Sequence, residues 1–349
     1  MVDTSRGCGT FARCPEHPRT SFTPERFDDM TARLSRRDFV RNTTLASAVP
    51  LALAPAARTA QVEAPPPVAP KPGSRDTLPM GRIGSVELSR VMLGGNLISG
   101  YAHSRDLTYV AQLMTHYNTE ARILETLETA EAHGINAINL AIWDDLSVLR
   151  KHGQRGGKLK LVAQAIARRE GDELALFKKA VDFGACAVHL QGHGAEILLK
   201  EENLDLMAKI IQYLQSQKVP AGIAAHGLNV IIECEKARIE PDFYVKTLHT
   251  HDYHTAPRPG EKGDLGRYDN SWCADPEEVV DFMWGVKKPW IAFKIMAAGA
   301  IPPQRAFPHA FNSGADFVLA GMFDWQIAED VRIAKAALSE VKRTRRWFG

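Results

Sequence analysis

Cysteine, net charge and long apolar runs are all scarce in this 349-residue chain, and each shortage excludes a class of protein. Five cysteines are present, and the three beyond residue 80 form an odd set without short spacings, which argues against a disulfide framework. A formal net charge of +2 without a long basic run gives no electrostatic basis for binding nucleic acid. The apolar run 43–57 is too short and too weakly apolar for an ordinary membrane span, so no stable span is expected after processing.

Residues 1–60 are predicted to be an N-terminal extension with a twin-arginine export signal. Arg36 and Arg37 precede the charge-free run 43–57, and Ala54-Pro-Ala56 offers a cleavage site of small residues. The order predicts recognition by the twin-arginine translocation machinery and a periplasmic or extracellular location. The alternative is a chance arginine pair ahead of an Ala-rich helix. Because the lead before the arginines is unusually long, Met30 competes with Met1 as the start.

Residues 61–80 are predicted to be a linker, because five prolines fall between Pro65 and Pro72 and no core can form there. From residue 81 to 349, strand and helix patterns alternate, as in parallel βα units. Eight segments have strand character and each is followed by a helical segment, which predicts an α/β protein, a (β/α)8 TIM barrel. The predicted strands begin near residues 90, 136, 160, 185, 221, 242, 289 and 317.

Side chains alternate between the two faces of a strand, so one face of each segment is expected to point into the barrel. That face carries small residues early in the strands and polar residues near their C-terminal ends, where such barrels place their sites. The polar members assigned to it are Asn96, Asn139, Gln164, His189, Gln191, His226, Thr247, His249 and Lys294, and Ala292 is assigned to the same face.

Three motifs, in this order, resemble the aldo/keto reductase superfamily over residues 82–340. They are Gly84-Ser-Val-Glu-Leu-Ser-Arg-Val-Met-Leu-Gly94, Ala130-Glu-Ala-His-Gly-Ile-Asn-Ala-Ile-Asn139, and Gly314-Ala-Asp-Phe-Val-Leu-Ala-Gly-Met322 followed by Gln326. The resemblance implies a TIM barrel, an NAD(P) cofactor contacted by Gln326, and a catalytic tetrad of Asp, Tyr, Lys and His.

The tetrad of that superfamily is largely missing here. Asn139 stands for its Asp, Gln164 for its Lys, and no Tyr falls near Asp144; only the His has candidates, His189 or His193. At the nucleotide phosphate, Phe323 and Asp324 replace the usual basic residue, and Asp330 replaces an Asn. Asn and Gln cannot donate the proton that carbonyl reduction needs, so NAD(P) is the less favoured cofactor.

Four histidines are predicted to gather at the barrel mouth. His189, His226 and His249 end consecutive strands, and His251 follows just above. Neutral imidazoles from neighbouring strands suit a divalent transition metal such as zinc. The alternative is that each ring only hydrogen-bonds a loop carbonyl or a substrate.

Lys294 is the predicted acid/base residue, because burial among small residues would lower its pKa. The alternative is an ion pair with Asp324 or Glu196. Lys246 points the other way and is expected to be structural. Side chains at the strand ends and in the two long loops are predicted to bind substrate: Asn96, Trp143, Gln191, Tyr253 and Trp272.

Three function classes follow from these patterns. The first is an exported barrel enzyme that acts on a small carbonyl or sugar-like substrate by non-redox lyase, isomerase or hydrolase chemistry. Its catalytic residues would be His189, His193 and Lys294, with Asn139 and Gln164 as orienting donors. The second is an NAD(P)-dependent oxidoreductase exported with its cofactor, and the third is a non-catalytic ligand-binding barrel.

Overall fold

The computed structural model describes residues 77–104, 107–259, 261, 266 and 268–349. The predicted export signal and residues 61–76 of the predicted linker lie outside the described residues.

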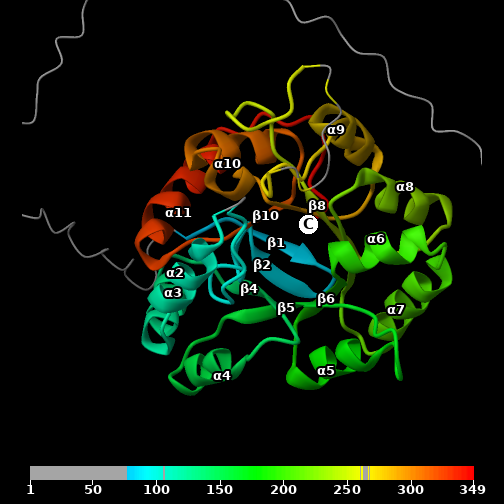
Figure 1. Ribbon diagram of the computed structural model, residues 1–349, viewed down its shortest axis with the longest axis horizontal. Helices are drawn as coiled ribbons and strands as arrows, with labels where there is room; N and C mark the ends of the chain where they lie inside the picture. Colours follow the sequence, from blue (N-terminus) through cyan, green and yellow to red (C-terminus); the bar gives the residue numbers. More distant parts are fainter. Residues whose placement is uncertain (1–76, 105–106, 260, 262–265, 267) are drawn as a thin grey trace, which may run out of the picture. The chain divides into compact units, whose positions relative to one another are not determined.

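A closed barrel of eight parallel strands forms the centre of the described chain, so the predicted TIM barrel is confirmed (Figure 1). Every predicted strand is present, and neighbouring strands pair in the order β10, β3, β4, β5, β6, β7, β8, β9. The barrel strands are β3 Val91–Gly94, β4 Ala137–Ala141, β5 Lys160–Ala165, β6 Ala187–Leu190, β7 Ala221–Ala225, β8 Phe243–Thr247, β9 Trp290–Phe293 and β10 Phe317–Ala320.

Helices surround this barrel on the outside (Figure 1). They are α2 Tyr109–Tyr117, α3 Glu120–Ala132, α4 Ser147–Gln154, α5 Ala175–Phe183, α6 Gly192–Lys200, α7 Leu204–Ser216, α8 Leu228–Lys236, α9 Pro276–Gly285, the 3-10 helix η1 Ala297–Gly299, α10 Pro303–Asn312 and α11 Asp324–Ser339. None of these described helices has the length and apolar character needed to cross a membrane.

Local sequence explains why the elements start and stop where they do. The Thr119 side chain accepts the Arg122 backbone N–H and caps α3. After α3, Gly134 adopts a left-handed φ of 88°, which turns the chain back toward β4 at low cost because glycine has no Cβ. Leu124, Leu127 and Ala130 are buried on one side of α3, as helical spacing requires.

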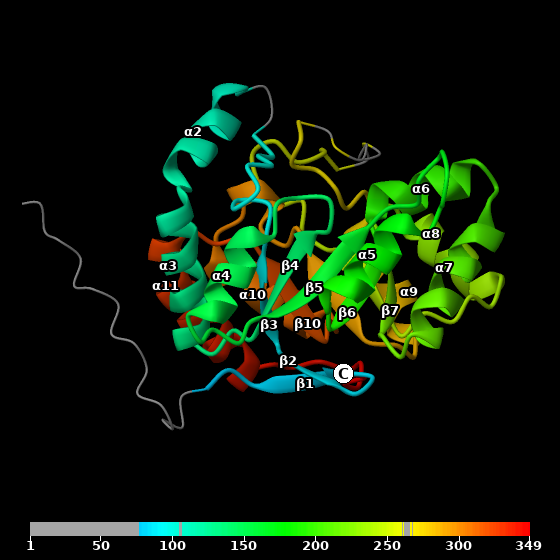
Figure 2. The ribbon, with the colours of Figure 1, turned by 90° about the horizontal axis from the view of Figure 1, so that it is seen from below.

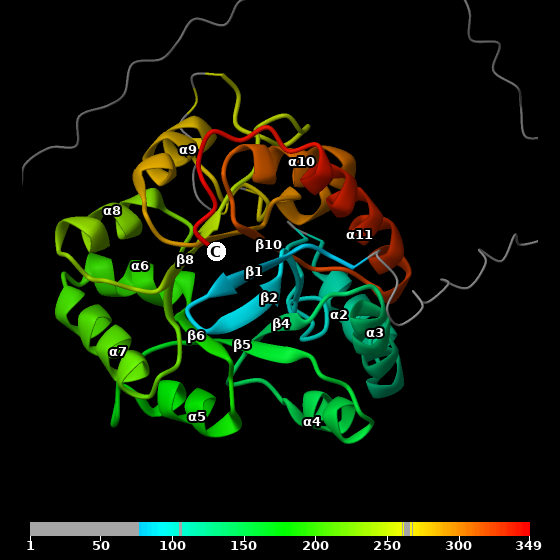
Figure 3. The same cartoon turned by 180° about the vertical axis from the view of Figure 1, so that it is seen from behind.

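Two apolar layers follow from strand alternation. Val91, Ile138 and Leu161 belong to the large outer core between strands and helices. The small inner core inside the barrel comprises Ile83, Leu88, Met92, Ala137, Val162, Ala187, Ala224, Phe243, Val245, Ile291 and Phe317. Ile83 and Leu88 come from the antiparallel hairpin of β1 Met80–Ile83 and β2 Val86–Ser89. This hairpin closes one end of the barrel, and Figures 2 and 3 show it there beside the C-terminus.

The structure corrects two of the predicted strand faces. In β9, Ile291 belongs to the inner core and Ala292 to the outer core, so the assignment of Ala292 to the interior was wrong by one residue. β8 ends at Thr247, so His249 and His251 lie in the following loop, where strand alternation no longer decides where a side chain points.

Candidate active site

Lys294 lies at the C-terminal end of β9 and extends toward the barrel mouth. Simple alternation from Ile291 and Phe293 would send it outward, but its backbone has left the strand and adopts a φ of 57°. This left-handed conformation is energetically costly for a residue other than glycine. Backbone strain of this kind is common at functional positions. The Lys294 Nζ lies 2.6 Å from Nε2 of His103, which belongs to the loop after β3.

His103 joins Lys294 to a carboxylate. Its Nδ1 lies 2.8 Å from Oδ1 of Asp269. An ionised carboxylate only accepts hydrogen bonds, so Nδ1 carries the ring proton and donates it. In the neutral ring Nε2 is then the acceptor, and it receives Lys294 and, at 3.3 Å, Nδ2 of Asn96. The result is a relay from Asp269 through His103 to Lys294.

Burial sets the charge state of this relay. It lowers the pKa of Lys294 from the usual 10.5 to about 7, although Asp269 and Glu196 favour the charged form. Burial, followed by the charge of Lys294, lowers the pKa of His103, with Asp269 opposing. Near neutral pH the lysine can therefore lose a proton, which an ordinary surface lysine holds firmly.

A second acid–imidazole pair flanks the relay. Nδ1 of His226 lies 3.2 Å from Oε1 of Glu196, and the backbone N–H groups of His226 and Gly227 donate to the same oxygen. Burial lowers the pKa of His226, with Glu196 opposing. Burial acts to raise the pKa of Glu196, but its bonds to His226 and Gly227 outweigh this and lower it. The pair is therefore a neutral imidazole held by a carboxylate.

Trp272 lies between the two pairs. Its ring centroid is 4.3 Å from Nζ of Lys294 and 4.6 Å from the ring centroid of His226. Its indole N–H donates to the backbone oxygen of Asp269, which fixes the ring. The predicted substrate-binding residue Trp272 is therefore brought to the same place as Lys294, His103 and His226.

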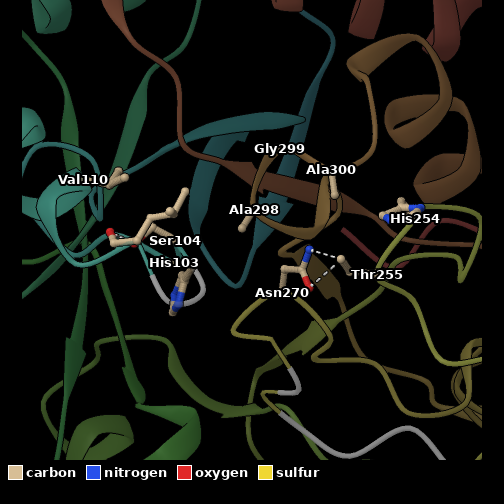
Figure 4. A pocket seen from close by; sticks show the side chains of 10 residues that line it. His103, Ser104, Val110, His254, Thr255, Asn270, Ala298, Gly299 and Ala300 are labelled. Atoms are coloured by element: carbon tan, nitrogen blue, oxygen red, sulfur yellow. Dashed lines mark hydrogen bonds between the residues drawn. The ribbon is translucent and has the colours of Figure 1, made fainter. Parts of the chain in front are cut away.

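A cavity of about 400 Å³ adjoins this cluster (Figure 4). His103 forms part of its wall, so the relay and the cavity share one imidazole. Thr255 and Asn270 hydrogen-bond each other on another wall, as Figure 4 shows. The remaining lining residues are Ser104, Leu107, Val110, His254, Ala298, Gly299 and Ala300.

Asn139 and His189 form a separate pair inside the barrel. Nδ2 of Asn139 donates to Nε2 of His189 at 2.9 Å and to the Val162 carbonyl. Nδ1 of His189 lies 3.3 Å from the Leu190 carbonyl, and burial lowers the His189 pKa to about 4. Gln164 is the direct strand neighbour of His189. These three predicted residues therefore lie on neighbouring strands, but the imidazole is buried and neutral, and both ring nitrogens are engaged.

The predicted metal site is not assembled. Nε2 of His249 accepts the backbone N–H groups of Trp272 and Cys273, and its Nδ1 lies 3.0 Å from the Thr250 carbonyl. Nε2 of His251 lies 2.7 Å from the Cys273 carbonyl. Over the ranges that the structure describes, no three His, Cys, Asp or Glu side chains form a group suited to a metal ion. Loop hydrogen bonding, the stated alternative, accounts for His249 and His251.

Two other predicted residues lie elsewhere. Gln191 caps α6 by accepting the Gly194 N–H, and it lines a second cavity of about 540 Å³ together with the exposed His193. The prediction that His193 acts beside Lys294 is not supported by this placement. Trp143 donates to the Tyr101 hydroxyl, and Tyr253 donates to the Asn270 carbonyl, so both side chains hydrogen-bond to residues of the long loops.

The residues at the start of α11 do not fit a nicotinamide cofactor well. The Gln326 side chain accepts the Phe323 N–H and closes a helix cap. Asp324 accepts the Tyr117 hydroxyl and pairs with Arg122 at 3.2 Å, so it is not the partner of Lys294. A carboxylate at this helix end disfavours a nucleotide phosphate, which a helix N-terminus would otherwise attract.

Sequence reasoning missed two members of the relay. These are His103 and Asp269, and the sequence singles out neither. Both lie in long loops without periodicity, so no local pattern marks them. The positive φ of Lys294 could not be predicted from the sequence either.

Comparisons with known proteins support the fold alone. No family model matches this chain, and no curated protein matches it by sequence. A solved structure assigned as an aldo-keto reductase of Pseudomonas aeruginosa is 16% identical and covers 76% of this chain and 98% of its own, with a TM-score of 0.50. An (S)-mandelate dehydrogenase is 12% identical over 76% of this chain and 79% of its own, with a TM-score of 0.45. An N-acetylneuraminic acid synthetase of Leptospira borgpetersenii is 9% identical over 78% and 94%, with a TM-score of 0.42.

Proposed function

We propose that this protein is an enzyme that acts on a small carbonyl or sugar-like compound by non-redox proton transfer, as in a lyase or an isomerase. The observation that carries the proposal is the chain of contacts from Asp269 through His103 to Lys294, beside a cavity of about 400 Å³. A carbonyl group makes hydrogens on the adjacent carbon acidic enough for a well-placed amine or imidazole to remove.

Lys294 is the acid/base residue in this proposal. Its proton passes to Nε2 of His103, and Asp269 stabilises the imidazolium that results. The free amine can then take a proton from substrate carbon and return it elsewhere. This is the role predicted from the sequence, with His103 and Asp269 in place of the predicted His193.

The cavity lining indicates the substrate class. Ser104, Thr255 and Asn270 supply neutral hydrogen-bonding groups, while Leu107 and Val110 supply apolar contact. A lining of this kind suits a small hydroxylated molecule better than a highly charged one.

An NAD(P)-dependent oxidoreductase is the alternative. The fold and the motif resemblance favour it, but the engaged Gln326 and the carboxylate of Asp324 do not. The export signal predicted in residues 1–60 also favours non-redox chemistry, because a diffusible nicotinamide pool is not expected outside the cytoplasm.

Exchange of carbon-bound hydrogen tests the proposal without knowledge of the physiological reaction. The protein is incubated in D2O with dihydroxyacetone, glyceraldehyde or hydroxyacetone, without nicotinamide, and deuterium incorporation next to the carbonyl is followed by NMR. We expect catalysed exchange that falls about 100-fold or more in Lys294→Met, the usual size of a general acid–base effect. The control Lys200→Met changes an exposed lysine and should behave as the wild type. Exchange that is equal in Lys294→Met and wild type would contradict the proposal.

A further inference from the structure

We propose that Lys294 is a covalent catalyst whose amine forms an imine with the substrate carbonyl. This inference rests on the proposed function and specifies it. The geometry that points to it is an amine that lies under an aromatic face and contacts an imidazole, His103, which itself lines the cavity.

The surroundings of Lys294 differ from those of a lysine used for structure. Lys246 is the useful contrast within this chain. Its Nζ is fully buried and donates to the His226 carbonyl, the Thr247 carbonyl and the Thr247 hydroxyl, so all three of its protons are used. Lys294 contacts a single hydrogen-bond partner, His103, and in the described part of the chain it forms no ion pair within 4 Å.

That partner is a proton acceptor, which matters for reactivity. An amine attacks a carbonyl carbon only through its lone pair, so the ammonium form must first lose a proton. His103 Nε2 is the acceptor nitrogen that can take it, because Nδ1 already donates to Asp269; the only other group near Nε2 in the described residues is the longer contact from Asn96 at 3.3 Å. Burial also favours the neutral amine, in line with the lowered pKa of Lys294.

The Nζ lone pair forms a bond to the carbonyl carbon while the C=O π electrons move to oxygen, and one proton passes from the nitrogen to that oxygen to give a neutral carbinolamine. A second proton on that oxygen lets it leave as water, while the nitrogen lone pair forms the C=N bond. No oxidant or reductant is consumed. The resulting iminium then accepts the electron pair of a neighbouring C–H or C–C bond, and the released proton or carbonyl fragment departs.

His226 is placed to handle the proton on the departing oxygen. Glu196 holds its Nδ1, and in the described residues no partner engages its Nε2. Its ring lies against Trp272, which also contacts the Lys294 amine. The indole face thus lies beside the position where the iminium charge forms, and an aromatic face stabilises such a cation.

Reductive trapping tests the imine directly. The full-length protein is treated with dihydroxyacetone and sodium borohydride, and adducts are measured by intact mass spectrometry and located by peptide mapping. We expect one adduct, with the mass of the probe less one oxygen atom, on Lys294 and at least about tenfold faster than on the exposed Lys200. Glu196→Gln, which weakens the hold on His226, should slow trapping about tenfold while circular dichroism stays unchanged.

The outcomes separate this inference from the proposed function. Hydrogen exchange that depends on Lys294, together with no adduct on Lys294, overturns the imine and leaves Lys294 as a simple base. An adduct on Lys294 without any exchange supports the imine and contradicts the proposed reaction. Adducts spread evenly over surface lysines, with no preference for Lys294, overturn the inference.

Discussion

Two lysines near the C-terminal ends of the neighbouring strands β8 and β9, the buried Lys246 and the half-buried Lys294, have opposite characters. Lys246 donates three hydrogen bonds to fixed acceptors, and one of these holds the carbonyl of His226 in place. Lys294 has one hydrogen-bonding neighbour, an imidazole that can take its proton. Burial lowers the pKa of both amines, so burial alone does not distinguish a structural lysine from a reactive one. The hydrogen-bond partners distinguish the structural lysine from the reactive one.

The pH dependence of Lys294 reactivity follows from its surroundings. With a pKa lowered to about 7, the reactive neutral amine should form as pH rises through 7, against about 10.5 for an ordinary lysine. Trinitrobenzenesulfonate labelling of Lys294, followed by peptide mass spectrometry from pH 5.5 to 10, measures this. The charged form is favoured by Asp269, so Asp269→Asn should move the midpoint lower still. A midpoint near 10 in the wild type would contradict the prediction.

The direction of a single side chain was predictable from alternation where the residue lies within a strand. Asn139, Gln164 and His189 lie on barrel strands, and alternation placed them correctly. Lys294 was found although its strand's alternation was misassigned, because a left-handed backbone turn brings it back to the mouth. Asp269 could not be predicted, since its position depends on how a long loop folds over the barrel.

At the scale of elements, the segment after β8 is a loop whose two ends are joined by hydrogen bonds to one histidine. His249 accepts the N–H groups of Trp272 and Cys273, more than twenty residues further along the chain. Trp272 and Asp269 both belong to the far end of this loop, so His249 positions the aromatic face and the carboxylate of the candidate site. The sequence suggested a metal ligand, because imidazole serves either purpose.

Acid should weaken this arrangement. Burial lowers the pKa of His249 from 6.5 to about 4, so the folded state keeps the ring neutral. Its contribution to stability is complete above pH 6.5, is lost as pH falls toward 4, and amounts to on the order of 3 kcal/mol.

Urea unfolding at pH 7.0 and at pH 4.5 measures the effect. His249→Gln, which cannot titrate, should lose less stability between these pH values than the wild type, whereas the exposed His116→Gln should match it. An equal loss in wild type and His249→Gln would show that His249 is not responsible. The similarly buried His189, with a pKa near 4, adds to the acid sensitivity of both proteins.

At the scale of the molecule, two features close the end of the barrel opposite the candidate site. They are the β1–β2 hairpin and a buried group of ion pairs around Asp316. Asp316 is fully buried and accepts Arg345 at 2.7 Å, Arg343 at 3.3 Å, and the backbone N–H groups of Trp290 and Phe348. These bonds tie the C-terminal segment to β9 and β10.

Breaking a buried ion pair from one side leaves uncompensated charge. Asp316→Asn should therefore lower the free energy of unfolding by about 3–5 kcal/mol, measured by urea denaturation at pH 7. Asp281→Asn, on the exposed side of α9, should cost little. A loss below about 1 kcal/mol in Asp316→Asn would mean that water or another carboxylate compensates the arginines.

The barrel end covered by the β1–β2 hairpin, called the back below, differs from the end that carries the candidate site, the mouth. The hairpin lies across one end of the barrel, opposite the end with the loops that follow β3 and β8 (Figure 2). Residues of those loops line the cavity of the candidate site. A surface linker or an antibody fragment attached to the exposed Glu87 on β2 would therefore leave the cavity facing the solution. Immobilisation at the back, with the mouth open, is a property of this architecture and holds whatever molecule the cavity receives.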